Sequence, residues 1–154
     1  MNLFSRFLEW IGISSSPILA LRRYLRFGLV GTSGVAVDMA VLFILADPWM
    51  LGLNLSLSKV LAAEIAIVGN FTLNELWTFR DLAVDNSWAA RVLRFGKFNL
   101  IWLAGIGLSV LLLNVQTRCF QINMYLANLL AILIVSLWNF GMNLRFGWNK
   151  NANP

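Results

Sequence analysis

The chain has 154 residues, of which 59% are hydrophobic and only 12% are charged. A soluble domain carries about 25% charged residues, so this composition excludes a water-facing exterior and indicates a membrane protein. The net charge of +5 does not indicate nucleic acid, because the basic residues gather at the edges of apolar runs and favour anionic lipid head groups or a phosphate. Cys119 is the one cysteine and histidine is absent, which excludes an internal disulfide, His-based catalysis and His metal sites.

Residues 1–21 contain no long apolar run, but apolar residues recur at helical spacing between Leu3 and Ile11. This spacing predicts a short amphipathic helix at the membrane interface, which residues 14–17 then break. The alternative is a disordered tail. The segment lacks the basic start and small-residue cleavage site of a signal peptide, so we expect it to be retained.

Four apolar runs follow, and each is long enough to cross a hydrocarbon core of ~30 Å at ~1.5 Å per residue. They cover residues 25–46, 55–77, 98–115 and 124–144. A polar connector at 80–97 separates the second run from the third, and residues 150–154 form a polar tail. The sequence therefore predicts an all-α membrane protein with four transmembrane helices.

Lysine and arginine are distributed unevenly between the two sides of these helices. Ten of them lie in the terminal segments and the 80–97 connector, whereas Lys59 and Arg118 fall on the other side. Basic loops stay in the cytoplasm, so we expect both termini and the connector to be cytoplasmic.

A short motif of asparagine and phenylalanine occurs twice. Asn70-Phe71 is followed by Asn74, and Asn139-Phe140 by Asn143, at an offset of 69 residues. Each motif closes an apolar run, and each unit opens on Arg-Phe-Gly, at Arg26 and Arg94. Two crossings per unit predict two parallel-repeat helix pairs, about 26–79 and 94–148, within a transmembrane domain at 22–149. All four asparagines should then lie near the cytoplasmic leaflet.

The charged residues Asp38, Lys59 and Glu64 lie away from the cytoplasmic ends of the first two runs. Asp38 lies near the bilayer middle, where a carboxylate costs ~2.5–3.5 kcal/mol and needs a partner, water or a proton. It is either a substrate or proton site or an acid hydrogen-bonded to a neighbouring helix. Glu64 lies deep and has the same alternatives. Lys59 is about 140° from Glu64 on the helical wheel, so the two should not pair, and Lys59 can extend to the interface.

The asparagines and the basic residues also allow two interpretations. Asn70 and Asn74 share one helix face, and Asn139 and Asn143 share another; they either bridge helices or line a groove for a sugar or phosphate head group. The basic patch that includes Arg26 either sets topology or binds a lipid phosphate bidentately, with Arg94 as its counterpart in the repeat.

Small residues also recur every four positions in the first helix, at Gly28, Thr32, Ala36 and Ala40. A ridge of small side chains lets another helix approach closely. It predicts a packing seam, either within the monomer or between subunits.

Together, the opening from Arg26 to Gly31, Asp38 and the two asparagine motifs resemble the GtrA-like family of small four-helix membrane proteins. The resemblance covers roughly residues 25–148. It implies a multi-pass protein of the inner membrane that works with polyprenyl-phosphate-linked sugars. One departure is Glu75, where relatives often carry a base after the second asparagine; the second motif keeps a base at Arg145.

The resemblance implies two alternative functions, and four helices with a buried acid add a third from a different class. The first is translocation of a polyprenyl-phosphate-linked sugar for surface polysaccharide or lipid glycosylation, through a polar groove that a second copy helps to enclose. The second is a non-catalytic subunit that anchors or regulates a membrane glycosyltransferase through the basic connector. The third is a small proton-coupled multidrug-type transporter. We expect no enzyme activity and no cofactor, because no nucleophile with a base, metal-ligand cluster or phosphate loop is present. The candidate substrate-binding residues are Arg26, Asp38, Glu64, Asn70, Asn74, Arg94, Asn139, Asn143 and Arg145.

Overall fold

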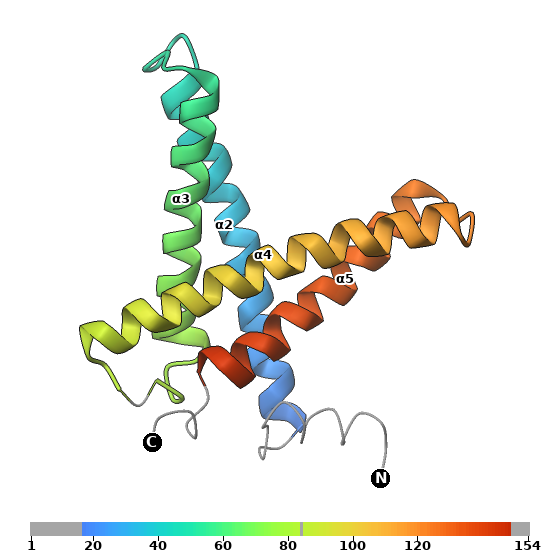
Figure 1. Ribbon diagram of the computed structural model, residues 1–154. Helices are drawn as coiled ribbons and strands as arrows, with labels where there is room; N and C mark the ends of the chain where they lie inside the picture. Colours follow the sequence, from blue (N-terminus) through green and yellow to red (C-terminus); the bar gives the residue numbers. More distant parts are fainter. Residues whose placement is uncertain (1–16, 84, 149–154) are drawn as a thin grey trace. The chain divides into compact units, whose positions relative to one another are not determined.

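A computed structural model describes residues 17–83 and 85–148, and every regular element in these ranges is helical. The α-helices are α2 (Pro17–Ala46), α3 (Leu55–Leu73), α4 (Trp88–Arg118) and α5 (Met124–Met142), and the π-helical turns are η1 (Asn74–Thr78) and η2 (Asn143–Gly147) (Figure 1). The all-α prediction is confirmed. The predicted amphipathic segment, apart from its last residues, and the tail at 150–154 lie outside the described residues.

Four helical segments of the described chain are long and apolar enough to cross a membrane, as predicted. They are Ile18–Ala46, Leu55–Thr78, Trp88–Arg118 and Met124–Gly147. Their most apolar stretches are only 11–22% buried within the protein. Such extensive exposed apolar surface is expected where lipid, and not water, is the solvent.

The first and third spans begin earlier than the hydropathy of the sequence indicates. Helix α2 already includes the basic patch of residues 22–26, and α4 begins at Trp88 and takes in half of the predicted connector. The Ser87 hydroxyl accepts a hydrogen bond from the Ala90 amide at 3.3 Å, so Ser87 caps the new helix start. Hydropathy marks where a helix enters lipid, whereas capping marks where the helix starts.

The contacts divide the chain into two units. Among the described residues, one unit is Leu21–Arg80, and the other contains α4, α5 and η2. In the first unit, a tight turn between α2 and α3 reverses the chain, with the Gly52 amide donating to the Asp47 carbonyl at 3.0 Å. Gly52 has a φ of +57°, a left-handed conformation that glycine adopts without strain.

The two helices of the first unit pack antiparallel along their length. At the end away from the turn, the rings of Phe27 and Phe79 lie 6.1 Å apart. Nearer the turn, Asp38 of α2 contacts Lys59 of α3. Helix α3 buries Ser58, Ala62 and Ala66, a row at four-residue spacing whose small side chains let α2 approach closely.

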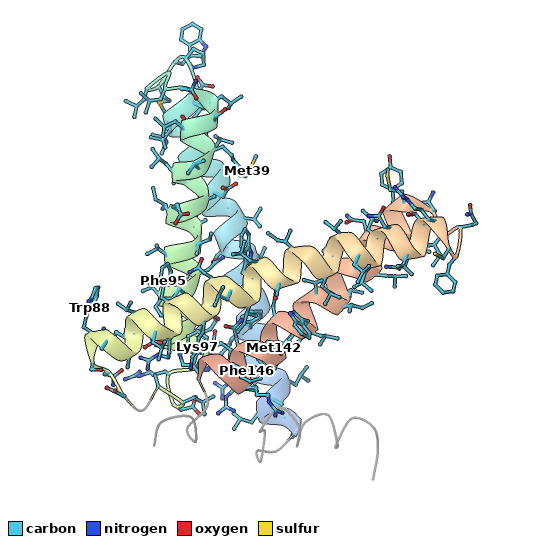
Figure 2. All side chains as sticks on the ribbon, in the orientation of Figure 1. Met39, Trp88, Phe95, Lys97, Met142 and Phe146 are labelled. Carbon is cyan, nitrogen blue, oxygen red and sulfur yellow. The ribbon has the colours of Figure 1, made fainter. Side chains whose placement is uncertain are left out.

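The second unit pairs α4 with α5 in the same antiparallel manner (Figure 1). Phe98 and Trp148 meet edge to face at 6.3 Å, and Ala127 and Ala131 are fully buried on α5. At the start of α4, the Trp88 side chain projects outward and is 80% exposed (Figure 2). Exposed tryptophan near the end of a span is typical of the membrane–water interface.

Candidate functional site

The charge that the sequence places inside the first span is paired. Lys59 Nζ donates to Asp38 Oδ2 at 2.5 Å, joining α3 to α2. The Asp38 side chain is 17% exposed and that of Lys59 is 54% exposed. The predicted need of Asp38 for a partner is thus met by Lys59. Pairing the two opposite charges lowers the free-energy cost of holding either one within an apolar span.

Lys59 was not among the candidate site residues, although a signal for it exists. In an antiparallel hairpin, residues at similar distances from the turn lie side by side. Asp38 and Lys59 are both within a few turns of the loop at residues 47–54. This relationship identifies Lys59 as the partner, which the helical wheel of α3 alone cannot do.

Glu64 lies on a different face from that pair. It is exposed, and it is about 200° around the helix from the buried Ala62. Among the residues that the structure describes, its carboxylate forms no ion pair or hydrogen bond. The structure therefore does not bring Glu64 and Asp38 into a common groove within the first unit.

The first asparagine of each motif packs against a glycine of the preceding helix. A Cβ added to Gly34 would lie 2.3 Å from the Asn70 amide, and one added to Gly105 would lie 2.6 Å from Asn139 Oδ1. Any larger residue at either glycine would overlap the amide. The first asparagine of each motif thus lies between paired helices, where it packs against a glycine.

The second asparagine of each motif begins a π-helical turn. Asn74 Nδ2 donates to the Asn70 carbonyl at 2.9 Å, and Asn143 Nδ2 donates to the Asn139 carbonyl at 2.8 Å. Both side chains are 2% exposed. The Asn70 and Asn139 carbonyls also accept the backbone N–H of Asn74 and Asn143, so each side-chain amide adds a second hydrogen bond at the point where the helix changes to π geometry. Such π-turns occur often at functional sites.

These buried amides still have acceptor capacity. In the described parts of the chain, no donor lies within hydrogen-bond reach of the Oδ1 atoms of Asn70, Asn74, Asn139 or Asn143. A buried acceptor without a partner is costly, so these oxygens are positions where a ligand or an ordered water would be stabilised. No three acidic or cysteine side chains of the described chain lie close enough together to hold a metal ion.

Arg26 lies at the end of the hairpin that carries the first motif. Its Nη1 donates to the Trp77 carbonyl at 3.4 Å, and its guanidinium lies 5.2 Å from the Trp77 ring centroid. The side chain is half-buried and is anchored by the π-turn. In the second unit, Arg145 lies within η2, 5.5 Å from the Phe146 ring.

Arg94 differs from Arg26 in its environment. It is buried, and its Nη1 donates to the Asp85 carbonyl at 2.8 Å. Phe27 of α2 and Phe98 of α4 form the equivalent ring contacts of the two units, and they are 71 residues apart in the sequence. The first helices of the two units therefore correspond at an offset of 71 residues, whereas the two Arg-Phe-Gly motifs are 68 residues apart. By this register Arg94 corresponds to Arg23, which is also buried. The predicted match of Arg94 with Arg26 is therefore wrong for the packing.

The Asp85 carboxylate organises the entry into α4. Its Oδ1 accepts a hydrogen bond from the Ser87 amide at 2.8 Å. The hydrogen bonds from the Ser87 backbone and side chain, and then the nearby Arg94 charge, hold the pKa of the Asp85 carboxyl below its usual value. Arg94 is therefore part of a structured corner at the start of the third span.

The predicted small-residue ridge on α2 does not face α3. Gly28, Thr32, Ala36 and Ala40 are exposed, and a Cβ added at Gly28 would meet nothing within 4 Å. A shallow depression of about 420 Å³ lies over part of this ridge, lined by Tyr24, Leu25, Gly28, Leu29 and Thr32. The packing face of α2 is instead the one that carries Phe27, Val30 and Gly34.

Comparison with models of protein families identifies the family of this chain. The model of the GtrA/DPMS transmembrane domain matches residues 26–148, which is most of the chain. The chain belongs to the GtrA/DPMS transmembrane-domain family. The resemblance seen in the sequence is thereby confirmed, and this member is a multi-pass membrane protein with four spans.

One curated relative of this GtrA/DPMS domain is similar over part of its length. It is the dolichol-phosphate mannosyltransferase of Pyrococcus furiosus, 28% identical over 100 residues. The match covers 65% of this chain and 24% of the relative. The chain therefore spans about a quarter of the length of the curated relative that it matches.

Proposed function

We propose that this chain moves a polyprenyl-phosphate-linked sugar across the inner membrane, for surface polysaccharide or lipid glycosylation. The observation that carries the proposal is the polar content of the first helix pair. An ion pair and two motif asparagines lie along a hairpin whose helices are long and apolar enough to cross a membrane. Family membership and the dolichol-phosphate relative support a lipid phosphate as the ligand.

In this proposal the head group passes along the polar side of the hairpins while the isoprenoid chain stays in lipid. Arg26, Arg145 and the motif asparagines receive the phosphate and sugar at the motif end, and Asp38 and Glu64 act deeper in the span. Guanidinium groups bind phosphate bidentately, and amides hydrogen-bond sugar hydroxyls. Arg94 is buried in its corner, so in this proposal it positions the start of α4 and is a weaker candidate for direct contact.

The proposed arrangement places both helix pairs in the same orientation, with termini and connector in the cytoplasm. Each unit has its motif, π-turn and basic residues at the end opposite its hairpin turn, which supports a parallel repeat. We further propose that a second copy encloses the path, and that Glu64, on an exposed face of α3, contributes from there. The chain itself catalyses no reaction in this proposal.

Transbilayer movement in reconstituted vesicles tests the proposal. Vesicles containing only the purified protein should move a polyprenyl-phosphate-linked sugar faster than protein-free vesicles. No movement by folded protein, with several sugars tried, would contradict a role as a stand-alone translocator.

A second candidate function is a non-catalytic subunit for a polyprenyl-phosphate glycosyltransferase. The observation that favours it is the relative, which is named as a mannosyltransferase and is about four times as long as the matched region. In that case the exposed bases Arg80 and Arg91, within the predicted connector at 80–97, would bind the transferase. Co-purification of a membrane glycosyltransferase with the chain would support this function.

A further inference from the structure

The ion pair within the first span has an asymmetry that bears on ligand binding. Asp38 is largely enclosed, whereas half of the Lys59 side chain is exposed. The ammonium group has three donors, and only the one to Asp38 is used among the described residues. Lys59 is therefore a cation that is held in place by one acceptor and remains accessible to another.

Lys59 lies at a definite distance from Arg26. Arg26 contacts Trp77, so the two cations are separated by 18 residues along α3 and η1, or about 27 Å at 1.5 Å per residue. This is close to the thickness of the hydrocarbon core, ~30 Å. The hairpin thus presents two cations whose separation along the helix is close to that thickness, and each is held by a contact to the neighbouring helix.

We propose that Lys59 is a second lipid-phosphate site, in the leaflet on the side of the turn between α2 and α3, where the phosphate of an isoprenoid lipid displaces Asp38 as the partner of Lys59. This inference rests on the proposed function for its class of lipid. Asp38 acts as an internal competitor: it holds the cation in position while the site is empty and returns to it when the lipid leaves. Binding is then weak enough to be reversible, as a transport path requires.

The second unit provides no equivalent site. The offset of 71 residues that matches α2 to α4 pairs Asp38 with Ser109. The offset of 69 residues that matches the two asparagine motifs pairs Lys59 with Asn128. Neither residue is charged, so the ion pair is a property of the first helix pair alone. The basic residue nearest the turn of the second unit is Arg118, in the last turn of α4, which is exposed and forms no ion pair within the described ranges.

The test uses a polyprenyl monophosphate with a photoreactive group beside the phosphate, and the full chain in phosphatidylcholine nanodiscs. Peptides labelled at residues 55–64 report the proposed site, and peptides labelled at 73–80 report the motif end. Lys59→Met should reduce labelling at 55–64 by about tenfold or more, because a charged hydrogen-bond partner is lost. Asp38→Asn should increase it several-fold, because the competitor is removed.

Opposite effects distinguish this site from a purely structural ion pair. Both substitutions break the same pair, so a structural role alone would shift labelling in the same direction for both. Lys59→Arg keeps the cation and should retain labelling, which covers the case in which Lys59→Met fails to fold. Arg118→Met removes one positive charge without touching the pair and should leave labelling at 55–64 unchanged.

Two competitors identify the source of the phosphate. Unlabelled polyprenyl monophosphate should displace the probe, whereas inorganic phosphate or phosphatidylglycerol at the same concentration should not. Equal competition by either would overturn the assignment to an isoprenoid lipid. Unchanged labelling in Lys59→Met would overturn the site while leaving translocation by the wild type intact. Conversely, opposite shifts in a protein that moves no lipid would retain the site and contradict the proposed function.

Discussion

The side-chain amide of Asn70 lies where a side chain on Gly34 would have to be, with only 2.3 Å between the amide and the position of a Cβ. The same relationship joins Asn139 to Gly105 in the other helix pair. Each motif thus acts with a glycine on the preceding helix, and the pair sets how closely the two helices approach.

Replacing Gly34 by alanine should therefore destabilise the first helix pair. Overpacking of this kind costs about 1–3 kcal/mol, here opposed by the higher helix propensity of alanine, up to ~1 kcal/mol. Thermal unfolding of the detergent-solubilised protein measures the difference. Gly28→Ala is the matched control on the same helix, since nothing lies within 4 Å of its added Cβ, and it should be neutral or stabilising. Equal stability of the two variants would contradict the proposed contact.

The second asparagine of each motif should stabilise its π-turn. Asn74→Ala removes one of the two donors to the Asn70 carbonyl, which keeps the Asn74 backbone N–H, at an expected cost of about 0.5–1.5 kcal/mol. Asn114→Ala removes the same kind of bond, to the Val110 carbonyl, at an exposed site, and should cost less. Amide hydrogen exchange at Phe79, whose N–H donates to the Asn74 carbonyl, gives a local readout. If protection there survives in Asn74→Ala, the side chain does not support the turn.

The entry into α4 should depend on pH only in the acid range. The hydrogen bonds from Ser87 depress the pKa of Asp85, so the folded corner favours the charged carboxylate. That contribution is present above the ordinary pKa of about 3.9 and is lost as the pH falls through the lowered folded value. NMR shifts of the Ser87 and Ala90 amides should stay constant from pH 8 to 5 and change in the acid range. Asp85→Asn should abolish that change; a transition near neutral pH would contradict the assignment.

Charge reversal in the connector should separate docking from folding. Arg91 is exposed, so Arg91→Glu should leave thermal stability unchanged and weaken co-purification of a glycosyltransferase if the chain is an accessory subunit. Arg94 is buried against the Asp85 carbonyl, so Arg94→Glu should lower stability, whichever function holds. Normal stability of Arg94→Glu would contradict the buried corner.

The sequence predicts the helices and locates the motif residues, because hydropathy and a repeated pattern are local signals. It does not predict the π-turns, since a change from i+4 to i+5 bonding leaves the spacing of the asparagines unchanged. The partner of Asp38 follows only once α2 and α3 are seen as an antiparallel hairpin. The repeated Arg-Phe-Gly motif matched Arg94 to Arg26, whereas the packing matches it to Arg23. Packing contacts, and not a short sequence identity, determine which residues of α2 and α4 correspond.

The most direct test of the central claim is the transbilayer movement of a polyprenyl-phosphate-linked sugar in vesicles that hold only this protein. The wild type should move the lipid faster than protein-free vesicles do, and Arg26→Met should slow it by removing the motif-end cation. Asp38→Asn should also slow it, because Lys59 then retains the phosphate. If folded wild-type protein leaves the lipid in its original leaflet, or if Asp38→Asn moves it at the wild-type rate, the path along the first helix pair is contradicted.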